Sequence, residues 1–301
     1  MTAEDWNKYK EDALGNYCGI GISMVAGENG YALITNIIKD GPAEKAGIQK
    51  EDYIIGINGE SVYKMDTSKI SNKVRGEEGT EITLNILRGE ETLDFVLKRE
   101  MIRMYHVEGE LLEDNIAYIT FSTFDDGCSK EFENVADSLV SQGADKMIID
   151  LRYNTGGDVK EALAILDLFL EKGQIQVITK SANGKELTTS SLNDKKYNLK
   201  NIVILTNKYT ASASEIVTGA LIDNNLAKTV GVKTYGKGVM QSVFSLLDGS
   251  VLKLTTQEYH TPNGTAINGI GITPNYEVEL ENDSEIDNQL EKAKSVVKGE
   301  E

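Results

Sequence analysis

The sequence predicts an α/β protein in which a small β-rich domain precedes a larger domain of alternating strands and helices. A chain of 301 residues has room for two domains. From about residue 17 to residue 100, short apolar runs are separated by glycines, a pattern typical of short strands and tight turns. From about residue 101 to residue 281, apolar runs alternate with segments of helical periodicity, which favours a parallel sheet covered by helices.

Residues 1–16 form the first expected element, a helical segment that ends near Gly15. This polar start has no basic patch followed by an apolar stretch, so we expect that the chain carries neither a signal peptide nor a membrane anchor. No run of about 18 apolar residues occurs anywhere in the sequence.

The β-rich domain is expected to contain short strands and two short helices. Pro42 near a helix start and Gly47 at its end predict the first helix. The second helix is expected over residues 69–74 and is closed by Gly76. The expected strands cover residues 19–22, 31–34, 53–59 and 82–87.

In the larger domain, strand and helix patterns follow one another three times. Apolar residues at helical spacing between Phe132 and Val140 place one face of a helix on the sheet. The polar stretch 181–200, with a turn at Asn183-Gly184, is expected to leave the sheet. A C-terminal helix is expected within residues 282–301. The other expected elements are strands 116–121, 147–151, 202–205, 229–232 and 252–256, and helices 159–170 and 215–225.

Composition excludes several classes of function. The net charge of −17 argues against a broad nucleic-acid-binding face and against attraction to anionic membranes. Cys18 and Cys128 form no CxxC pair, so neither a disulfide framework nor a zinc site is indicated, and we expect both to be buried and free. His106 and His260 are isolated, and spacing alone leaves a Cys/His nucleophile pair open without local support. We therefore expect no metal and no cofactor.

Three segments that follow predicted strands carry residues capable of chemistry. In Asp150-Leu151-Arg152-Tyr153-Asn154-Thr155-Gly156-Gly157, the glycine amides could face an anion or a developing oxyanion, although an ordinary strand-to-helix turn also explains two glycines. In residues 206–215, Ser212 or Ser214 is either a nucleophile at a helix start or a helix N-cap. In residues 234–241, Lys237 between two glycines is either a base or a surface lysine, and no phosphate-loop pattern surrounds it.

Taken together, the three segments resemble the signature of the carboxyl-terminal processing (tail-specific) proteases. This family shows an Asp-Leu-Arg-x-Asn-x-Gly-Gly turn, an Ala-Ser-Ala-Ser-Glu segment and a Gly-Lys-Gly-x-x-x-Gln segment, and all three occur here in that order. Gly41-Pro42-Ala43, Ala46-Gly47-Ile48 and residues 52–59 resemble the PDZ domains of bacterial proteases. The resemblance spans about residues 19–279 and implies a crotonase/Clp-protease-like catalytic core after an N-terminal PDZ domain.

The resemblance implies a serine endopeptidase with Ser212 as nucleophile, Lys237 as general base and Gln241 as the residue that orients the lysine. An ordinary lysine is a cation at neutral pH, so a lysine base requires desolvation that favours the neutral amine. Backbone amides of Ala213 and of either Gly156 or Gly157 would form the oxyanion hole. Ser214 and Glu215 are interpreted as support for the helix start.

In the implied PDZ domain, Gly19, Ile20, Gly21 and Ile22 resemble the loop that binds a substrate's C-terminal carboxylate. Arg75 resembles an arginine that links peptide binding to the catalytic domain. The implied partners are polypeptides with free, apolar C-termini, and a homodimer and an extracytoplasmic location are further expectations of the resemblance.

The sequence departs from the family pattern at three positions. Thr155 stands where proline is common, Thr210 replaces a frequent serine, and His260 takes a position that is often aromatic. Two other functions compete with the peptidase: a catalytically silent PDZ scaffold, and a crotonase-like enzyme acting on acyl thioesters. The set of Ser212, Lys237 and Gln241 argues against the silent scaffold, and a PDZ domain has no use in the thioester enzyme.

Overall fold

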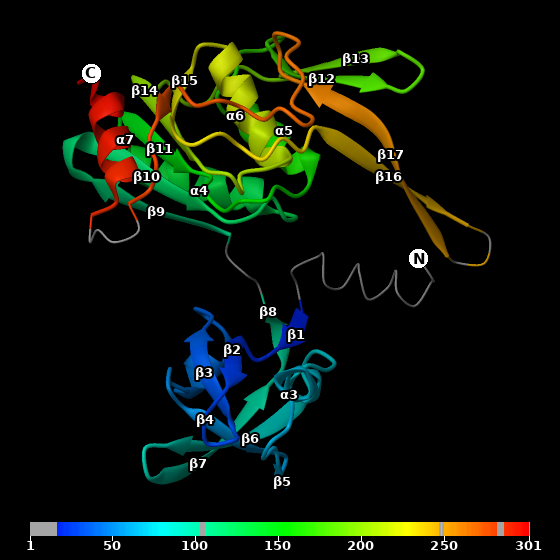
Figure 1. The fold of residues 1–301 in the computed structure, drawn as a ribbon. Helices are drawn as coiled ribbons and strands as arrows, with labels where there is room; N and C mark the ends of the chain where they lie inside the picture. Colours follow the sequence, from blue (N-terminus) through cyan, green and yellow to red (C-terminus); the bar gives the residue numbers. More distant parts are fainter. Residues whose placement is uncertain (1–16, 103–105, 247, 249, 282–285, 301) are drawn as a thin grey trace. The chain divides into compact units, whose positions relative to one another are not determined.

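The computed structural model describes residues 17–102, 106–246, 248, 250–281 and 286–300 (Figure 1). The helix expected within residues 1–16 lies outside these ranges. Contacts divide the chain into two compact units, of which the described parts are residues 17–102 and the residues from 106 onward. Each unit has its own hydrophobic core.

The first unit is a β-sheet with two short helices. Its sheet has the order β2-β3-β4-β6-β7, with β5 paired to β4, while β1 and β8 form a separate antiparallel pair. Arg99 is buried and donates hydrogen bonds to the carbonyls of Lys73 and Val74 at the end of α3. The elements are β1 Tyr17–Gly19, β2 Ile22–Ala26, β3 Ala32–Ile37, α2 Pro42–Ala46, β4 Tyr53–Ile57, β5 Glu60–Ser61, α3 Thr67–Val74, β6 Glu81–Arg88, β7 Glu91–Lys98 and β8 Glu100–Ile102.

The second unit contains a sheet with the order β18-β15-β14-β11-β10-β9, which is parallel except for β9. Its elements up to α5 are β9 Val107–Leu112, the 3-10 turn η1 Glu113–Asn115, β10 Ile116–Phe121, α4 Cys128–Ser141, β11 Lys146–Asp150 and α5 Val159–Leu166. The later elements are β12 Ile175–Ser181, β13 Glu186–Ser190, β14 Asn201–Thr206, α6 Ala213–Asp223, β15 Ala227–Gly231, β16 Val239–Ser245, β17 Val251–His260, β18 Tyr276–Glu277 and α7 Asn288–Lys298.

Both faces of this parallel sheet are buried, which explains why its strands are continuous apolar runs. In β11, Met147 and Ile149 point into the core beneath α4, α5 and α6, whereas Ile148 points into the core beneath α7. Figure 1 shows α7 on the side of the sheet away from α5 and α6. The sheet is therefore the middle of three layers.

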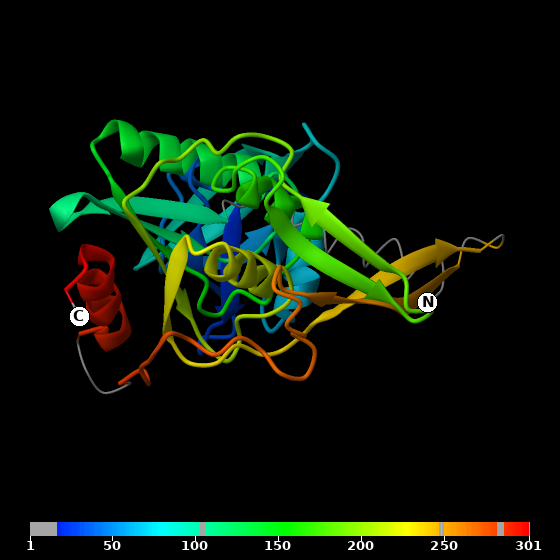
Figure 2. The same cartoon turned by 90° about the horizontal axis from the view of Figure 1, so that it is seen from above.

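A second, antiparallel sheet of the same unit has the order β13-β12-β17-β16. Figures 1 and 2 show β16 and β17 extending away from the rest of the unit. The stretch 181–200, expected to leave the main sheet, contributes β13 to this second sheet. Some expectations were wrong in detail: α5 ends at Leu166 rather than at residue 170, and Cys18 is half-buried, whereas Cys128 is buried as expected.

Candidate active site

Three loops that follow neighbouring strands meet at one edge of the parallel sheet. Strands β11, β14 and β15 are adjacent and parallel, so their carboxyl ends lie at the same edge. The loop after β11 carries Gly156, the loop after β14 carries Ser212, and the loop after β15 carries Lys237. The fold thus brings together the three segments that the sequence singles out.

Ser212 stands immediately before helix α6 in an unusual backbone conformation. Its φ of 59° and ψ of −119° lie in a region that side-chain-bearing residues rarely adopt. Such conformations cost of order 1–3 kcal/mol and persist where the surrounding structure enforces them. Here the Ser212 amide donates a 2.9 Å hydrogen bond to Oε2 of Glu215, so the strained turn is held by a side chain from the first turn of α6.

Glu215 is the centre of the polar contacts around Ser212. Its side chain is 0% exposed, and its two oxygens accept four hydrogen bonds. Oε1 accepts from Thr234 Oγ1 at 2.6 Å and from the Gly236 amide at 2.7 Å. Oε2 accepts from the Ser212 amide and from the Lys237 amide, each at 2.9 Å. The carboxylate therefore joins the Ser212 loop to the Lys237 loop, a role beyond the helix-start support that the sequence indicates.

Tyr259 on β17 is a further contact of Ser212 that the sequence does not reveal. Its Oη lies 3.1 Å from Ser212 Oγ and donates to the carbonyl of Lys237. The phenol has one hydrogen and a carbonyl can only accept, so the hydrogen shared with Ser212 comes from the serine. Burial, with a smaller contribution from Glu215, raises the pKa of Tyr259 to about 12, although the Ser212 hydrogen bond lowers it. Tyr259 therefore stays protonated at neutral pH.

The side chains of Lys237 and Gln241 are both exposed. Within the part of the chain that the structure describes, no hydrogen bond joins Lys237 Nζ to Ser212 Oγ or to the Gln241 carboxamide. The backbones are nevertheless close: the Ser212 and Lys237 amide nitrogens lie within about 6 Å of each other, because each is 2.9 Å from the same oxygen. The flexible four-carbon stem of a lysine can span such a separation by rotation.

Asn154 joins the glycine turn to the Ser212 loop by hydrogen bonds. It is fully buried, and its Oδ1 accepts hydrogen bonds from the Gly156 amide and from Ser214 Oγ, each at 2.9 Å. Its Nδ2 donates to the carbonyl of Phe121 at 2.7 Å. The buried Ser214 hydroxyl thereby joins the first turn of α6 to the glycine turn.

The two glycines of the turn differ in their surroundings. A Cβ on Gly156, whose φ is +98°, would lie 2.7 Å from Ser212 Cβ, so Gly156 packs directly against the Ser212 loop. Its amide, however, is bound by Asn154 Oδ1. The amides of Gly157 and Ala213 donate to no acceptor within the described residues, and they are the candidates for an oxyanion hole.

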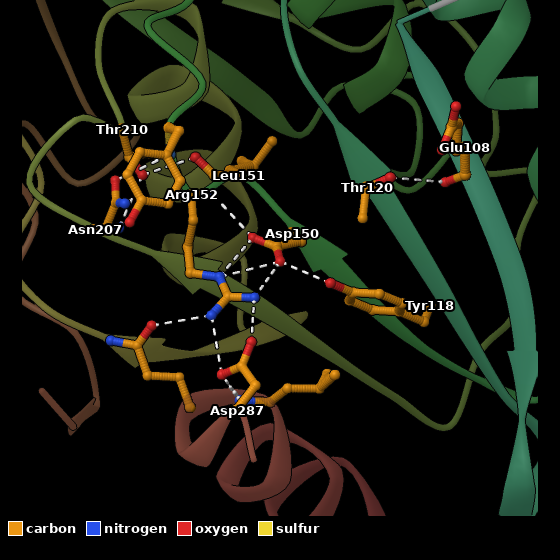
Figure 3. A network of polar contacts seen from close by, with 12 residues as sticks. Glu108, Tyr118, Thr120, Asp150, Leu151, Arg152, Asn207, Thr210 and Asp287 are labelled. Atoms are coloured by element: carbon orange, nitrogen blue, oxygen red, sulfur yellow. Dashed lines mark hydrogen bonds and ion pairs between the residues drawn. The ribbon is translucent and has the colours of Figure 1, made fainter. Parts of the chain in front are cut away.

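A charged network is centred on Arg152 in the loop after β11 (Figure 3). The Arg152 guanidinium lies between Asp150 and Asp287, with its Nη2 at 2.6 Å and 2.8 Å from their carboxylates. Tyr118 donates a 2.8 Å hydrogen bond to Asp150. Arg152, whose side chain is 10% exposed, thereby ties the loop after β11 to the start of α7.

In the first unit, the predicted peptide-binding residues lie around the start of β2. Ile20 and Gly21 separate β1 from β2, and Gly21 has a φ of +78°. Their amides donate to no acceptor among residues 17–102 or the rest of the described chain. Strand β2, which starts at Ile22, is an edge strand of its sheet. Arg75 is exposed and follows the last residue of α3.

The described residues contain neither a cluster suited to a metal ion nor a helix suited to a membrane span. No three His, Cys, Asp or Glu side chains among them converge in a way that would hold a metal ion. Of the helices described, none has the length and apolar character needed to cross a membrane.

Comparison with known proteins identifies both units. Residues 115–278 match the model of peptidase family S41, and residues 33–88 match a PDZ domain. A probable CtpA-like serine protease of Staphylococcus epidermidis is 37% identical over 279 residues, which are 92% of this chain and 56% of that protein. A protein of the same description from Staphylococcus saprophyticus is 37% identical over 93% of this chain and 57% of its own length. The chain thus spans a little over half the length of these relatives.

Solved structures also match the fold of this chain. The photosystem II D1 C-terminal processing protease matches with a TM-score of 0.58 and 25% identity, over 93% of this chain and 76% of that one. A putative S41 protease from Bacteroides fragilis matches in fold with a TM-score of 0.59 and 19% identity, over 94% and 83% of the two chains. The described architecture is therefore an S41 peptidase fold preceded by a PDZ domain, in agreement with the crotonase/Clp-like α/β core expected from the sequence.

Proposed function

The chain belongs to peptidase family S41, and from that premise we propose that it is a serine endopeptidase of the carboxyl-terminal processing type. Its substrates are polypeptides recognised by the PDZ domain through a free, apolar C-terminus. The observation that carries the proposal is the strained Ser212 turn, whose amide shares one buried carboxylate oxygen with the amide of Lys237.

In the proposed reaction, Ser212 Oγ attacks the scissile carbonyl and Lys237 accepts the serine proton. The lysine side chain rotates from its exposed position toward Ser212 when substrate fills the site. Catalytic hydrogen bonds are often absent before substrate binds, so the exposed side chain is compatible with this role. Bound polypeptide excludes water, and the desolvation favours the neutral amine that a base requires. Gln241 accepts or donates a hydrogen bond to that amine without adding charge.

The negative charge on the attacked carbonyl oxygen is stabilised by backbone amides. Ala213 and Gly157 supply these amides, because the Gly156 amide is already bound to Asn154. Collapse of the tetrahedral intermediate releases the C-terminal fragment, to which the lysine returns its proton. Water then hydrolyses the acyl-serine in a second attack assisted by the same lysine.

The PDZ domain captures the substrate's C-terminus in the segment Gly19, Ile20, Gly21 and Ile22. The two amides of Ile20 and Gly21 that have no acceptor in the described chain support this assignment, since such amides can hold a carboxylate. The open edge of β2 then pairs with the peptide as an added strand. Arg75 links peptide binding in the PDZ domain to the catalytic unit. A homodimer and an extracytoplasmic location remain predictions from family resemblance.

Peptide cleavage tests the proposed function. An unstructured peptide with an apolar, free C-terminus should be cut, its C-terminally amidated copy should be cut more slowly, and Ser212→Ala should cut neither. A chain that binds the free peptide through its PDZ domain yet leaves it uncut would instead support the silent scaffold. Equal cutting by Ser212→Ala would show that another residue is the nucleophile.

A further inference from the structure

We propose that Tyr153 and Tyr209 form an aromatic platform that selects an aromatic side chain of the polypeptide substrate close to the cleaved bond. This inference rests on the proposed peptidase function and adds a substrate preference to it. Each tyrosine belongs to a loop of the candidate site: Tyr153 lies three positions before Gly156, and Tyr209 lies three positions before Ser212.

The two rings are stacked and exposed. Their centroids are 5.5 Å apart with an interplanar angle of 22°. Tyr153 is 61% exposed and Tyr209 is 47% exposed. Two adjacent aromatic rings in water form an apolar surface whose burial by a ligand is favourable, and tyrosine is enriched among residues that dominate binding energy.

Hydrogen bonds from the backbone of both tyrosines to one side chain hold the platform in place. Oδ1 of Asn207 accepts the amides of both Tyr153 and Tyr209, each at 3.0 Å. The Asn207 amide in turn donates to Thr210 Oγ1 at 2.9 Å. Tyr153 has a φ of +64°, a costly conformation for a bulky residue that often marks a functional position. A preorganised surface loses little conformational entropy when it binds.

Of the two rings, that of Tyr153 is the one that a substrate side chain can contact. Lys208 Nζ lies 5.2 Å from the centroid of the Tyr209 ring. For Tyr153, the described residues include no ring or cation in contact other than Tyr209. Tyr153 also lines a cavity of about 520 Å³, together with His106, Asp150 and Arg152. A substrate ring placed against Tyr153 in this cavity would extend the stack in the offset geometry that aromatic rings prefer.

The acidic residues that line the cavity attract a basic substrate side chain less strongly than their number suggests. Glu108, Asp150 and Asp287 line the cavity, but Arg152 is bound to both aspartates, which leaves Glu108 as the acidic side chain of the lining that has no ion pair with Arg152. Contact with the aromatic surface should therefore decide the preference. The three residues from Tyr153 to Gly156 span at most about 11 Å of chain, so the selected side chain lies within about four residues of the cleaved bond.

The test is a positional scan with the full chain. One cleavable peptide is varied to Phe, Tyr, Ala or Lys at each of the positions near the cut. We expect an aromatic residue at one position to raise kcat/KM about tenfold over alanine, through KM rather than kcat. Tyr153→Ala should reduce this preference to about twofold or less, and Tyr153→Gly, which tolerates the positive φ, should do the same. Tyr63→Ala, an exposed tyrosine that pairs with Tyr31 at 5.3 Å, is the matched control and should keep the preference.

Labelling of Ser212 by a fluorophosphonate separates the two proposals, because the small probe does not need the platform. A parent chain that is neither labelled nor active on any peptide would overturn the proposed function and the platform with it. Labelling at the parental rate in Tyr153→Gly, together with an unchanged aromatic preference, would overturn the platform alone. A preference for lysine at every position, or no preference in an active parent, would also contradict it.

Discussion

Ser212 and Lys237 donate their backbone amides to the same atom, Oε2 of Glu215, each at 2.9 Å. The two residues come from loops that follow different strands, and this shared acceptor fixes the distance between the loops. The backbone around the proposed nucleophile and base is therefore positioned before substrate binds, and only the lysine side chain has to move.

Glu215→Gln should disrupt this arrangement although it preserves shape. A carboxamide has one accepting oxygen, so its NH2 group would face two of the four present donors. We expect a loss of about 3 kcal/mol in the free energy of unfolding and at least a hundredfold fall in kcat. Urea unfolding and peptide cleavage measure both. Glu186→Gln, an exposed carboxylate on β13, is the control; equal behaviour of the two variants would refute the role of Glu215.

Gly156→Ala should damage both folding and activity. The new Cβ would lie 2.7 Å from Ser212 Cβ and 2.7 Å from the carbonyl oxygen of Ala211. Gly173→Ala is matched in backbone, since its φ is +89° and no atom lies within 4 Å of the new Cβ. We expect thermal unfolding to show a cost of about 1 kcal/mol for Gly173→Ala and at least about 3 kcal/mol for Gly156→Ala. Similar costs would mean that the loop relaxes freely.

Tyr259→Phe removes the hydroxyl that contacts Ser212 Oγ and the Lys237 carbonyl. The partly buried carbonyl of Lys237 loses its donor, which should cost about 1–2 kcal/mol of stability. Because the serine and the lysine loop lose a common partner, we expect kcat to fall about tenfold with little change in KM. Steady-state kinetics check this. Tyr235→Phe, in which the altered hydroxyl belongs to an exposed residue, should behave like the parent.

Asp287 should make the docking of α7 sensitive to acid. Burial raises the pKa of Asp287, but the hydrogen bond and charge of Arg152 outweigh it, so that this pKa lies below its ordinary value of 3.8. A lowered pKa in the folded state contributes stability that is present above about pH 4 and is lost as the pH falls further.

Asp287→Asn keeps a good N-cap for α7 and removes the charge. Calorimetry should show a Tm about 2 °C below that of the parent at pH 6, since the pair is partly exposed and its contribution is modest. The difference should shrink below pH 4. A difference that grows as the pH falls would contradict this assignment.

Local sequence patterns predicted the parallel core well. The strand expected over 116–121 coincides with β10 Ile116–Phe121, because an apolar run buried on both faces has few alternatives. The second sheet was harder to foresee. Strands β13 and β16 are largely exposed, so no buried face gives them a clear periodicity. The sheet also depends on the pairing of β12 with β17, which lie far apart in the sequence.

Part of the candidate site could likewise be predicted from the sequence, whereas another part depended on the fold. The order of the three motifs predicted that the Gly156, Ser212 and Lys237 loops lie close together, because each loop follows a strand of one parallel sheet. Tyr259 had no such signal: it lies in a strand of the second sheet, and only the fold brings it to Ser212. The choice between two glycines also depended on the fold, since the Asn154 side chain occupies one of their amides.

The central claim is that Lys237 activates Ser212. Mass spectrometry of the full chain after treatment with a fluorophosphonate tests it directly, because only an activated serine reacts rapidly. We predict one adduct on Ser212 in the parent, none in Ser212→Ala, and labelling of Ser212 at least a hundredfold slower in Lys237→Ala. An adduct on a different residue, or labelling of Lys237→Ala at the parental rate, would contradict the account.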